Sequence, residues 1–185
     1  MEKADILAGC KYLFGKWGVH RVNMDEVSNH FGISKKTLYK IYDNKDAIVM
    51  DYVKYLIDES RKELKRRMDE AGTEVIMVSV FNWFIVEQSL TLGVVLFYEI
   101  KKYHPSAFDL LKKYKYELIN FLNDLLKDGQ RMGIFRSEID TLVFAKLRID
   151  LLEWEIMEAK TSAGNIASNQ KLLFDLMLNG LKVAH

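Results

Sequence analysis

The residues best suited to recognise another molecule lie at positions 34–45. This stretch carries four lysines against one acidic residue. Helical spacing places Lys36, Thr37 and Lys40 on neighbouring exposed positions. A short helix that presents lysines, a hydroxyl group and tyrosines can enter the major groove of DNA and hydrogen-bond the edges of the bases. The pattern therefore indicates nucleic-acid recognition.

The same lysines have a simpler interpretation, because a run of charge is commonly no more than the solvated face of a helix. Tyr39 has an alternative too, since it could pack against the first helix of the chain. The formal net charge of +1 does not support DNA binding by itself, because the whole chain is not strongly basic. The hypothesis of DNA contact therefore depends on the elements that would hold this segment.

Two short helices joined by a tight turn would hold it. Asn23 can cap the first of them, and Glu26 at the third helical position completes a capping box. Gly32 ends that helix and Ser34 caps the next one. A glycine-containing turn at 31–33 between short helices is typical of the helix-turn-helix arrangement.

The rest of the chain predicts helices and no strand. Apolar spacing from Ile6 to Trp17 predicts a first helix that ends at Gly18, and Cys10 on it is expected to be a small buried residue. Asp46 opens a long helix. We expect further helices over about 74–90, 91–103, 105–132, 141–160 and 166–183.

These elements predict an all-α protein of about nine helices. An N-terminal three-helix head with the helix-turn-helix covers residues 1–45. A long fourth helix over 46–70 connects the head to a C-terminal helical bundle over 71–185.

Four motifs at the N-terminal end are informative together. They are the first-helix residues Ile6, Leu7, Cys10, Leu13, Phe14 and Gly18, the segment Asn23–Val27, the segment Gly32–Tyr42, and Asn44-Lys45-Asp46. Over residues 6–48 the sequence resembles the tetracycline-repressor (TetR) family of transcriptional regulators. It departs from the usual family pattern at Cys10, Ser28 and Lys36. Because Lys36 lies on the surface that would read DNA, the operator sequence of a relative cannot be assumed for this chain.

The resemblance and the helix-turn-helix pattern together assign the DNA contacts. Lys45 and Tyr42 suit phosphate groups, and the others lie on or beside the recognition helix. The full set is Asn23, Met24, Ser34, Lys35, Lys36, Thr37, Tyr39, Lys40, Tyr42 and Lys45.

The last two helices are apolar nearly all round, which exceeds what one buried face needs. In the resembled family they form the dimer interface, so we expect a homodimer on a near-palindromic operator; a large intramolecular core is the alternative. The expected interface residues are Leu147, Leu151, Trp154, Leu173 and Met177.

The helices before them carry more aromatic residues than packing requires, although an aromatic stripe is commonly ordinary core. The resembled family encloses a small-molecule pocket here, so residues 71–185 are expected to bind an effector as well as to dimerise. Arg148, on an otherwise apolar helix, is either a polar group of the pocket or part of an interface ion pair. The candidate ligand contacts are Trp83, Phe84, Glu87, Phe97, Tyr98, Phe121 and Arg148.

The sequence therefore predicts a cytoplasmic regulator, a repressor released by a small, mostly apolar ligand. The alternative is an architectural or nucleoid-type DNA-binding protein of the same fold without an effector. No nucleophile motif, phosphate-binding glycine loop or metal-ligand spacing is evident, so we expect no enzyme activity, no catalytic residue, no metal and no cofactor. We also expect no leader sequence and no membrane span.

Overall fold

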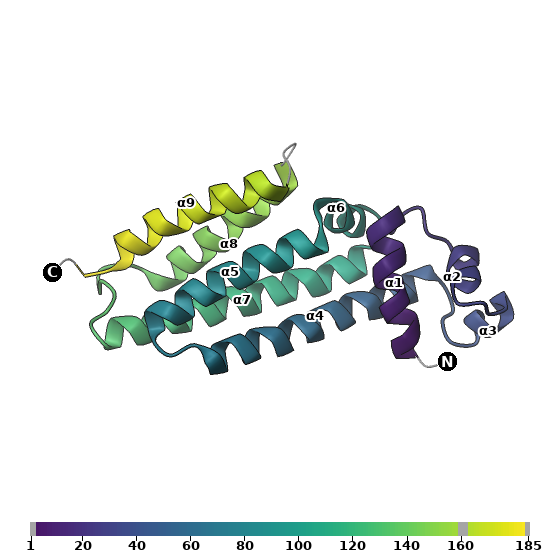
Figure 1. Cartoon of the computed structure of the whole chain (residues 1–185), viewed down its shortest axis with the longest axis horizontal. Helices are drawn as coiled ribbons and strands as arrows, with labels where there is room; N and C mark the ends of the chain where they lie inside the picture. The colour runs from purple at the N-terminus through teal and green to yellow at the C-terminus, as the bar shows by residue number, and fades with distance from the viewer. Residues whose placement is uncertain (1–2, 159–162, 184–185) are drawn as a thin grey trace. The chain divides into compact units, whose positions relative to one another are not determined.

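The computed structural model describes residues 3–158 and 163–183. Within these ranges it has nine helices and no strand, with one isolated bridge between Phe135 and Lys182 (Figure 1). The helices are α1 (Lys3–Trp17), α2 (Met24–His30), α3 (Lys35–Tyr39), α4 (Lys45–Glu70), α5 (Glu74–Leu92), α6 (Val94–Tyr103), α7 (Pro105–Arg131), α8 (Thr141–Glu158) and α9 (Ala163–Leu181). The all-α prediction is confirmed; the predicted end of α8 at Lys160 lies outside the described residues.

Side-chain caps define the two short helices. The Oδ1 atom of Asn23 accepts hydrogen bonds from the backbone N–H groups of Asp25 and Glu26, at 2.9 and 3.0 Å. The Glu26 carboxylate accepts the Asn23 N–H in return, at 2.7 Å. Ser34 Oγ accepts the N–H of Thr37 at 3.1 Å, at the start of α3. Each bond satisfies an amide that the helix itself leaves unpaired, and the predicted capping box is confirmed.

The chain forms two compact units, each described here by itself. The first comprises Met1–Ser60 and Leu92–Lys113 and holds α1, α2, α3, the first part of α4, α6 and the start of α7. In its core the rings of Phe14 and Tyr52 meet edge to face, with centroids 5.1 Å apart. Its fully or almost fully buried apolar residues include Ile6, Cys10, Val19, Val22, Val27, Leu38, Tyr42, Ile48, Val49 and Ile100. The predicted burial of Cys10 is confirmed, and burial raises the pKa of its thiol to about 12.

The second unit comprises Arg61–Thr91 and Tyr114–His185. Here the rings of Phe81 on α5 and Phe121 on α7 stack with centroids 5.6 Å apart. Helices α8 and α9 pack side by side (Figure 1). Because α4 and α7 each contribute to both units, the units divide the chain elsewhere than the predicted boundaries after residues 45 and 70, which stay a prediction. Of the helices in the described ranges, none is long and apolar enough to cross a membrane.

In the second unit, close packing between Gly129 and the ring of Phe135 fixes the end of α7. A Cβ atom added to Gly129 would lie 2.1 Å from Cδ2 of Phe135 and 3.2 Å from its Cγ. The Phe135 side chain is 2 % exposed, so the ring has little room to retreat. Gly180 also lies near the end of a helix of this unit. Apart from its chain neighbours and the backbone of its own helix, no heavy atom of the described residues lies within 4 Å of its added Cβ.

Gly129→Ala should therefore lower the free energy of unfolding by about 1–3 kcal/mol, because the methyl group overpacks a site that cannot expand. Gly180→Ala is the matched control and should raise it by about 0.5–1 kcal/mol, since alanine favours the helix over glycine. Urea denaturation followed by circular dichroism measures both. Two equal changes would show that the contact between Gly129 and Phe135 does not constrain the chain.

Candidate nucleic-acid interface

Helix α3 presents almost all of its side chains to solvent. Leu38 is fully buried and anchors the helix on the first unit. The remaining residues of α3 and its C-terminal cap are exposed: Lys35, Lys36, Thr37, Tyr39 and Lys40. The exposed fraction of Tyr39 is 49 %, so this ring is not part of the core. The predicted outward face of α3 therefore exists, and it is basic and rich in hydrogen-bond donors.

Two of these side chains are held by neighbours on the same surface. Lys35 forms an ion pair with Asp25 of α2. The hydroxyl groups of Ser34 and Thr37 lie 2.9 Å apart and share a hydrogen bond. Lys36 and Lys40 project beside them, exposed to solvent. These contacts orient part of the face while two ammonium groups stay on the surface.

Asn23 and Met24 lie at the start of α2. Asn23 is exposed, but its Oδ1 atom is occupied by the capping box, which leaves the amide NH2 group as its outward donor. Met24 is half-buried. Both therefore stay predicted contacts at the start of α2.

Tyr42 occupies a different place from the one expected of a phosphate contact. Its side chain is 2 % exposed, and among the described residues nothing hydrogen-bonds its hydroxyl group. Burial, together with the negative charge of Asp51, raises its pKa to about 12. The Nζ atom of Lys3 lies 4.8 Å from the centre of its ring. Tyr42 is thus a core residue that follows α3, and its buried hydroxyl group is not placed to contact a phosphate group on the surface.

Lys45 also turns inward. Its Nζ atom donates a hydrogen bond to the backbone carbonyl of His20, at 3.0 Å. Burial lowers the pKa of this ammonium group, against the opposing effect of the nearby carboxylates of Glu99, Asp46 and Glu26. The side chain links the start of α4 to the loop between α1 and α2. Its contribution to DNA binding would therefore be made through the position of the head.

The turn between α2 and α3 depends on a close approach to α1. Gly32 adopts a left-handed backbone conformation with φ of +61°, which glycine reaches without steric cost. A Cβ atom on Gly9 of α1 would lie 2.1 Å from Cζ of Phe31, at the end of α2. The ring of His30, beside Phe31, stacks on Tyr12 of α1. The sequence prediction used Gly32 but missed Gly9, whose role depends on a contact distant in sequence.

Helix α6, although it is distant in sequence, contacts the loop between α1 and α2. The Glu99 carboxylate accepts the backbone N–H of His20 at 2.9 Å. Gly18, with φ of +79°, lets this carboxylate approach, because a Cβ atom there would be 2.8 Å from both Glu99 oxygens. The rings of His20 and Tyr103 stack with centroids 4.1 Å apart. None of these contacts was foreseen from sequence, although the stop at Gly18 was.

A second link joins the end of α6 to the start of α4. His104 is 7 % exposed, and its Nδ1 atom lies 2.6 Å from Oδ1 of Asp46. Together with Lys45, this contact places the first turn of α4 against both the loop and α6. The helix-turn-helix and α6 therefore form a single packed unit, in agreement with the division of the chain into compact units.

The predicted ligand contacts do not share one environment. Phe97 and Tyr98 lie in the first unit, and the other five lie in the second. Phe84 is fully buried, with the Arg67 guanidinium 5.8 Å from its ring centre, whereas Trp83 is 40 % exposed. Phe121 is half-buried and stacks on Phe81. Arg148 is almost completely buried, at 2 % exposure.

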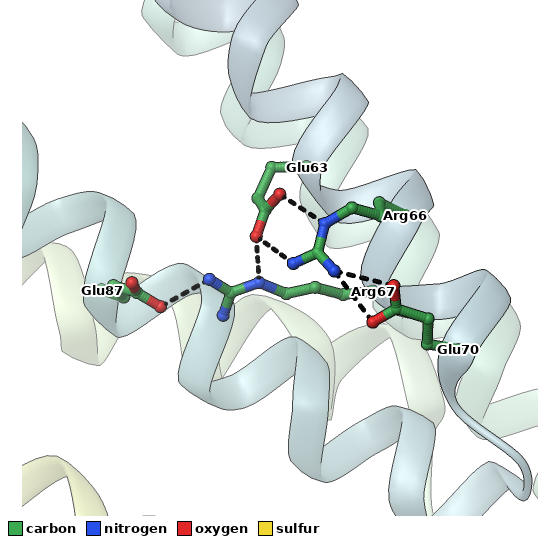
Figure 2. A network of polar contacts seen from close by, with 5 residues as sticks. All are labelled: Glu63, Arg66, Arg67, Glu70 and Glu87. Carbon is green, nitrogen blue, oxygen red and sulfur yellow. Dashed lines mark hydrogen bonds and ion pairs between the residues drawn. The ribbon is translucent and has the colours of Figure 1, made fainter.

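Glu87, expected as a polar anchor for a ligand, belongs to a surface network (Figure 2). Its carboxylate pairs with Nη2 of Arg67 at 2.8 Å. Arg67 and Arg66 both donate to Glu63, and these hydrogen bonds lower the pKa of Glu63 to about 2. Arg66 also pairs with Glu70 at 2.8 Å. Glu87 is therefore better explained as one of the charges that join α4 to α5.

The predicted interface residues on α8 and α9 differ in exposure. Leu147 and Trp154 are 51 % and 64 % exposed, while Leu151, Leu173 and Met177 are half-buried. Sequence reasoning missed three exposed neighbours, Val143, Leu172 and Leu176, at 60 %, 64 % and 64 %. A helix that is apolar all round does not reveal which stripe faces its own core, so the exposed stripe could be identified only from the structure.

Among the described residues, no cluster of histidine, cysteine and acidic side chains could hold a metal ion.

Glu99→Ala should loosen the loop between α1 and α2, because the His20 N–H loses its acceptor. We expect a loss of about 1 kcal/mol in the free energy of unfolding. Glu99→Gln, which keeps an oxygen acceptor but removes the charge near Lys45, should lose less. Lys101→Ala on the same helix is the control. Chemical denaturation of the three variants decides the point, and equal stabilities for Glu99→Ala and Lys101→Ala would contradict the role of Glu99.

Comparison with known proteins agrees with this geometry. Residues 6–51 match the family model of bacterial regulatory proteins of the tetR family. An uncharacterized HTH-type transcriptional regulator, YhgD of Bacillus subtilis (strain 168), is 23 % identical over 165 residues, which cover 83 % of this chain and 84 % of the relative.

Solved structures share the fold over nearly the whole chain. A putative transcriptional regulator from Saccharomonospora viridis, in complex with choline, has a TM-score of 0.81 at 14 % identity and covers 98 % of both chains. A TetR-family regulator from Cytophaga hutchinsonii has a TM-score of 0.79 at 15 % identity and covers 99 % of this chain and 96 % of its own. The N-terminal head therefore matches the tetR family of bacterial regulatory proteins over residues 6–51, and the chain shares the fold of solved TetR-family regulators.

Proposed function

We propose that the protein is a homodimeric repressor that binds a near-palindromic operator through α3 of each subunit and leaves it when a small, mostly apolar ligand binds. The observation that carries the DNA half of the proposal is the exposed face of α3. Lys36, Thr37 and Lys40 stand there free of the core, while Leu38 fixes the helix beneath them. Lysine donates to the acceptors of guanine in the major groove, and threonine contacts several bases, so this face suits direct readout of sequence.

The homodimer is supported by the outer faces of α8 and α9. Val143, Leu147 and Trp154 form one apolar stripe on α8, opposite the buried stripe that contains Ala145 and Leu152. Soluble monomers rarely expose contiguous apolar surface of this kind. We propose that a second copy of the same chain covers this stripe. An apolar patch can pair with its own copy across a two-fold axis, because such an interface needs only a self-complementary patch.

Helix α9 extends this surface with Leu172 and Leu176, which are each 64 % exposed and lie one turn apart. Since α8 and α9 pack side by side, the two stripes belong to one unit of the chain. A symmetric dimer would place two copies of α3 on one side of the duplex. Half-sites about 34–36 Å apart, one helical turn of DNA, would then be read together.

Release by a ligand is supported by two observations. A protein of the same fold, a putative transcriptional regulator from Saccharomonospora viridis, was solved in complex with choline, and this supports a small-molecule ligand for the present chain. In this chain, Arg148 is a charged side chain buried in the second unit, as polar groups of ligand sites are. An architectural DNA-binding protein without an effector would instead show no response to any ligand and little preference among DNA sequences.

The DNA contacts are tested by single substitutions on α3. Lys36→Ala and Thr37→Ala should each change the order of preference among operator variants, with the best site losing affinity about tenfold, because a base contact is removed. Lys65→Ala, which removes an exposed lysine of the second unit, should leave both affinity and preference unchanged. Binding is measured against a duplex selected from a random library by the wild-type protein. Unaltered preference in both α3 variants would place the reading surface elsewhere.

The dimer is tested on α9. Leu176→Asp should convert the dimer to a folded monomer, because the carboxylate would be buried without a partner at the interface. Lys171→Asp, an exposed position of the same helix, should remain a dimer. Sedimentation velocity at micromolar concentration gives the masses, and circular dichroism confirms that both variants fold. A monomeric wild-type protein would refute the interface.

A further inference from the structure

Arg148 is an unusual residue for the interior of a helical unit. It lies on α8 with only 2 % of its side chain exposed. Arginine is almost never buried to this degree unless another charge pairs with it. Yet among the described residues no carboxylate forms an ion pair with this guanidinium group. The residue is held instead by a neutral partner.

That partner is Asn82 on α5. The Oδ1 atom of Asn82 accepts hydrogen bonds from Nε of Arg148, at 2.8 Å, and from Nη2. A guanidinium group only donates, so the amide must turn its oxygen towards it and its NH2 group away. Within residues 3–158 and 163–183, neither Nη1 of Arg148 nor Nδ2 of Asn82 has a hydrogen-bond partner, although both atoms are buried. Two adjacent side chains thus keep unused donors and a net positive charge.

The nearest compensation comes from Glu155, two turns further along α8. Its charge favours the protonated form of Arg148, while burial lowers the pKa of Arg148 to about 10. The guanidinium group therefore remains charged at neutral pH. The Glu155 oxygens are occupied by amides of α9: Oε1 accepts from Asn169 at 2.8 Å and Oε2 from Gln170. Glu155 therefore weakens the positive field of Arg148 without satisfying its donors.

Apolar residues surround the pair on both helices. Val78 and Val86 lie one turn before and after Asn82 on α5, and both are buried. Ala145 and Leu152 occupy the corresponding positions around Arg148 on α8 and are also buried. A group that binds here would meet donors and positive charge at one end and hydrocarbon at the other.

We propose that Arg148 and Asn82 recognise the carboxylate of an otherwise apolar ligand in the second unit. The inference rests on the proposed function, since it names the chemical class of the effector. A carboxylate accepts hydrogen bonds through both oxygens and carries the charge that would neutralise Arg148, and arginine binds such planar anions preferentially. A cation would be repelled by the guanidinium group, and a neutral amide would leave its charge uncompensated.

The competing explanation is that Arg148 and Asn82 form a structural tie between α5 and α8. The two explanations differ in what a hydrophobic replacement of both residues does. A buried polar pair with unsatisfied donors can be replaced by apolar side chains of similar volume without loss of stability. If the pair is kept for binding, Arg148→Met combined with Asn82→Leu should melt at the wild-type temperature or above. If it is a structural tie, the double variant should melt at a lower temperature or fail to fold.

The binding experiment uses the full chain and four probes. Decanoate and 4-phenylbutanoate carry the carboxylate, and decanamide and 4-phenylbutanamide are their neutral counterparts. Isothermal titration calorimetry at pH 7.5 should show the wild-type protein binding each acid about 10- to 100-fold more tightly than its amide. The double variant should lose this preference. Lys146→Met, on an exposed position of α8, should retain it.

Any of four results would overturn the inference: no binding of either acid, equal binding of acids and amides, an acid preference that survives in the double variant, or a double variant that is less stable than the wild type.

A measurement of DNA binding distinguishes this inference from the proposed function. If an amide binds and displaces DNA, the effector proposal holds and the carboxylate inference fails. If the acids bind through Arg148 and DNA affinity does not change, the inference holds and release by ligand fails.

Discussion

A helix of five residues has almost no stability of its own in water, because nucleating a helix costs more than so few hydrogen bonds return. Helix α3 is such a helix, so its conformation depends on what surrounds it. Leu38 and Tyr42 are buried on its inner side, and the hydroxyl group of Ser34 accepts the backbone N–H of Thr37. The position of the exposed side chains of α3 is therefore set by core contacts.

This constraint divides the basic segment into two groups with different roles. Lys36 and Lys40 point outward, and Lys45 turns back to the His20 carbonyl. From His20 the contacts continue to Glu99 on α6. The first unit thus includes a helix from the middle of the chain, and any movement of α6 within that unit acts on the loop that supports the helix-turn-helix.

The parts of the fold that depend on local sequence were predictable. The caps at Asn23 and Ser34 and the glycine at position 32 follow from residues within one turn, and all are found. The burial of Tyr42 was missed because an aromatic residue after a basic helix fits either surface or core. The contact of Glu99 with His20 joins residues 79 positions apart, which periodicity cannot indicate.

The second unit shows the same limit. Helix α8 is apolar on every side, so hydrophobic periodicity could not distinguish its core stripe from its exposed stripe. The structure places Ala145 and Leu152 in the core stripe, and Leu147 and Trp154 in the exposed one. Arg148 was recognised as anomalous because of its charge, but its neutral partner on α5 became evident only in three dimensions. Helix and turn positions were therefore available from the sequence, whereas the partners of charged residues were not.

Amide hydrogen exchange of the full chain, with and without a duplex selected by the wild-type protein, tests most directly whether α3 is the surface that meets DNA. Exchange should slow in residues 34–40 and at the start of α2 when the duplex is bound, because a ligand that binds the folded state suppresses local opening. Unchanged exchange throughout α3, with protection confined to another segment, would contradict the account.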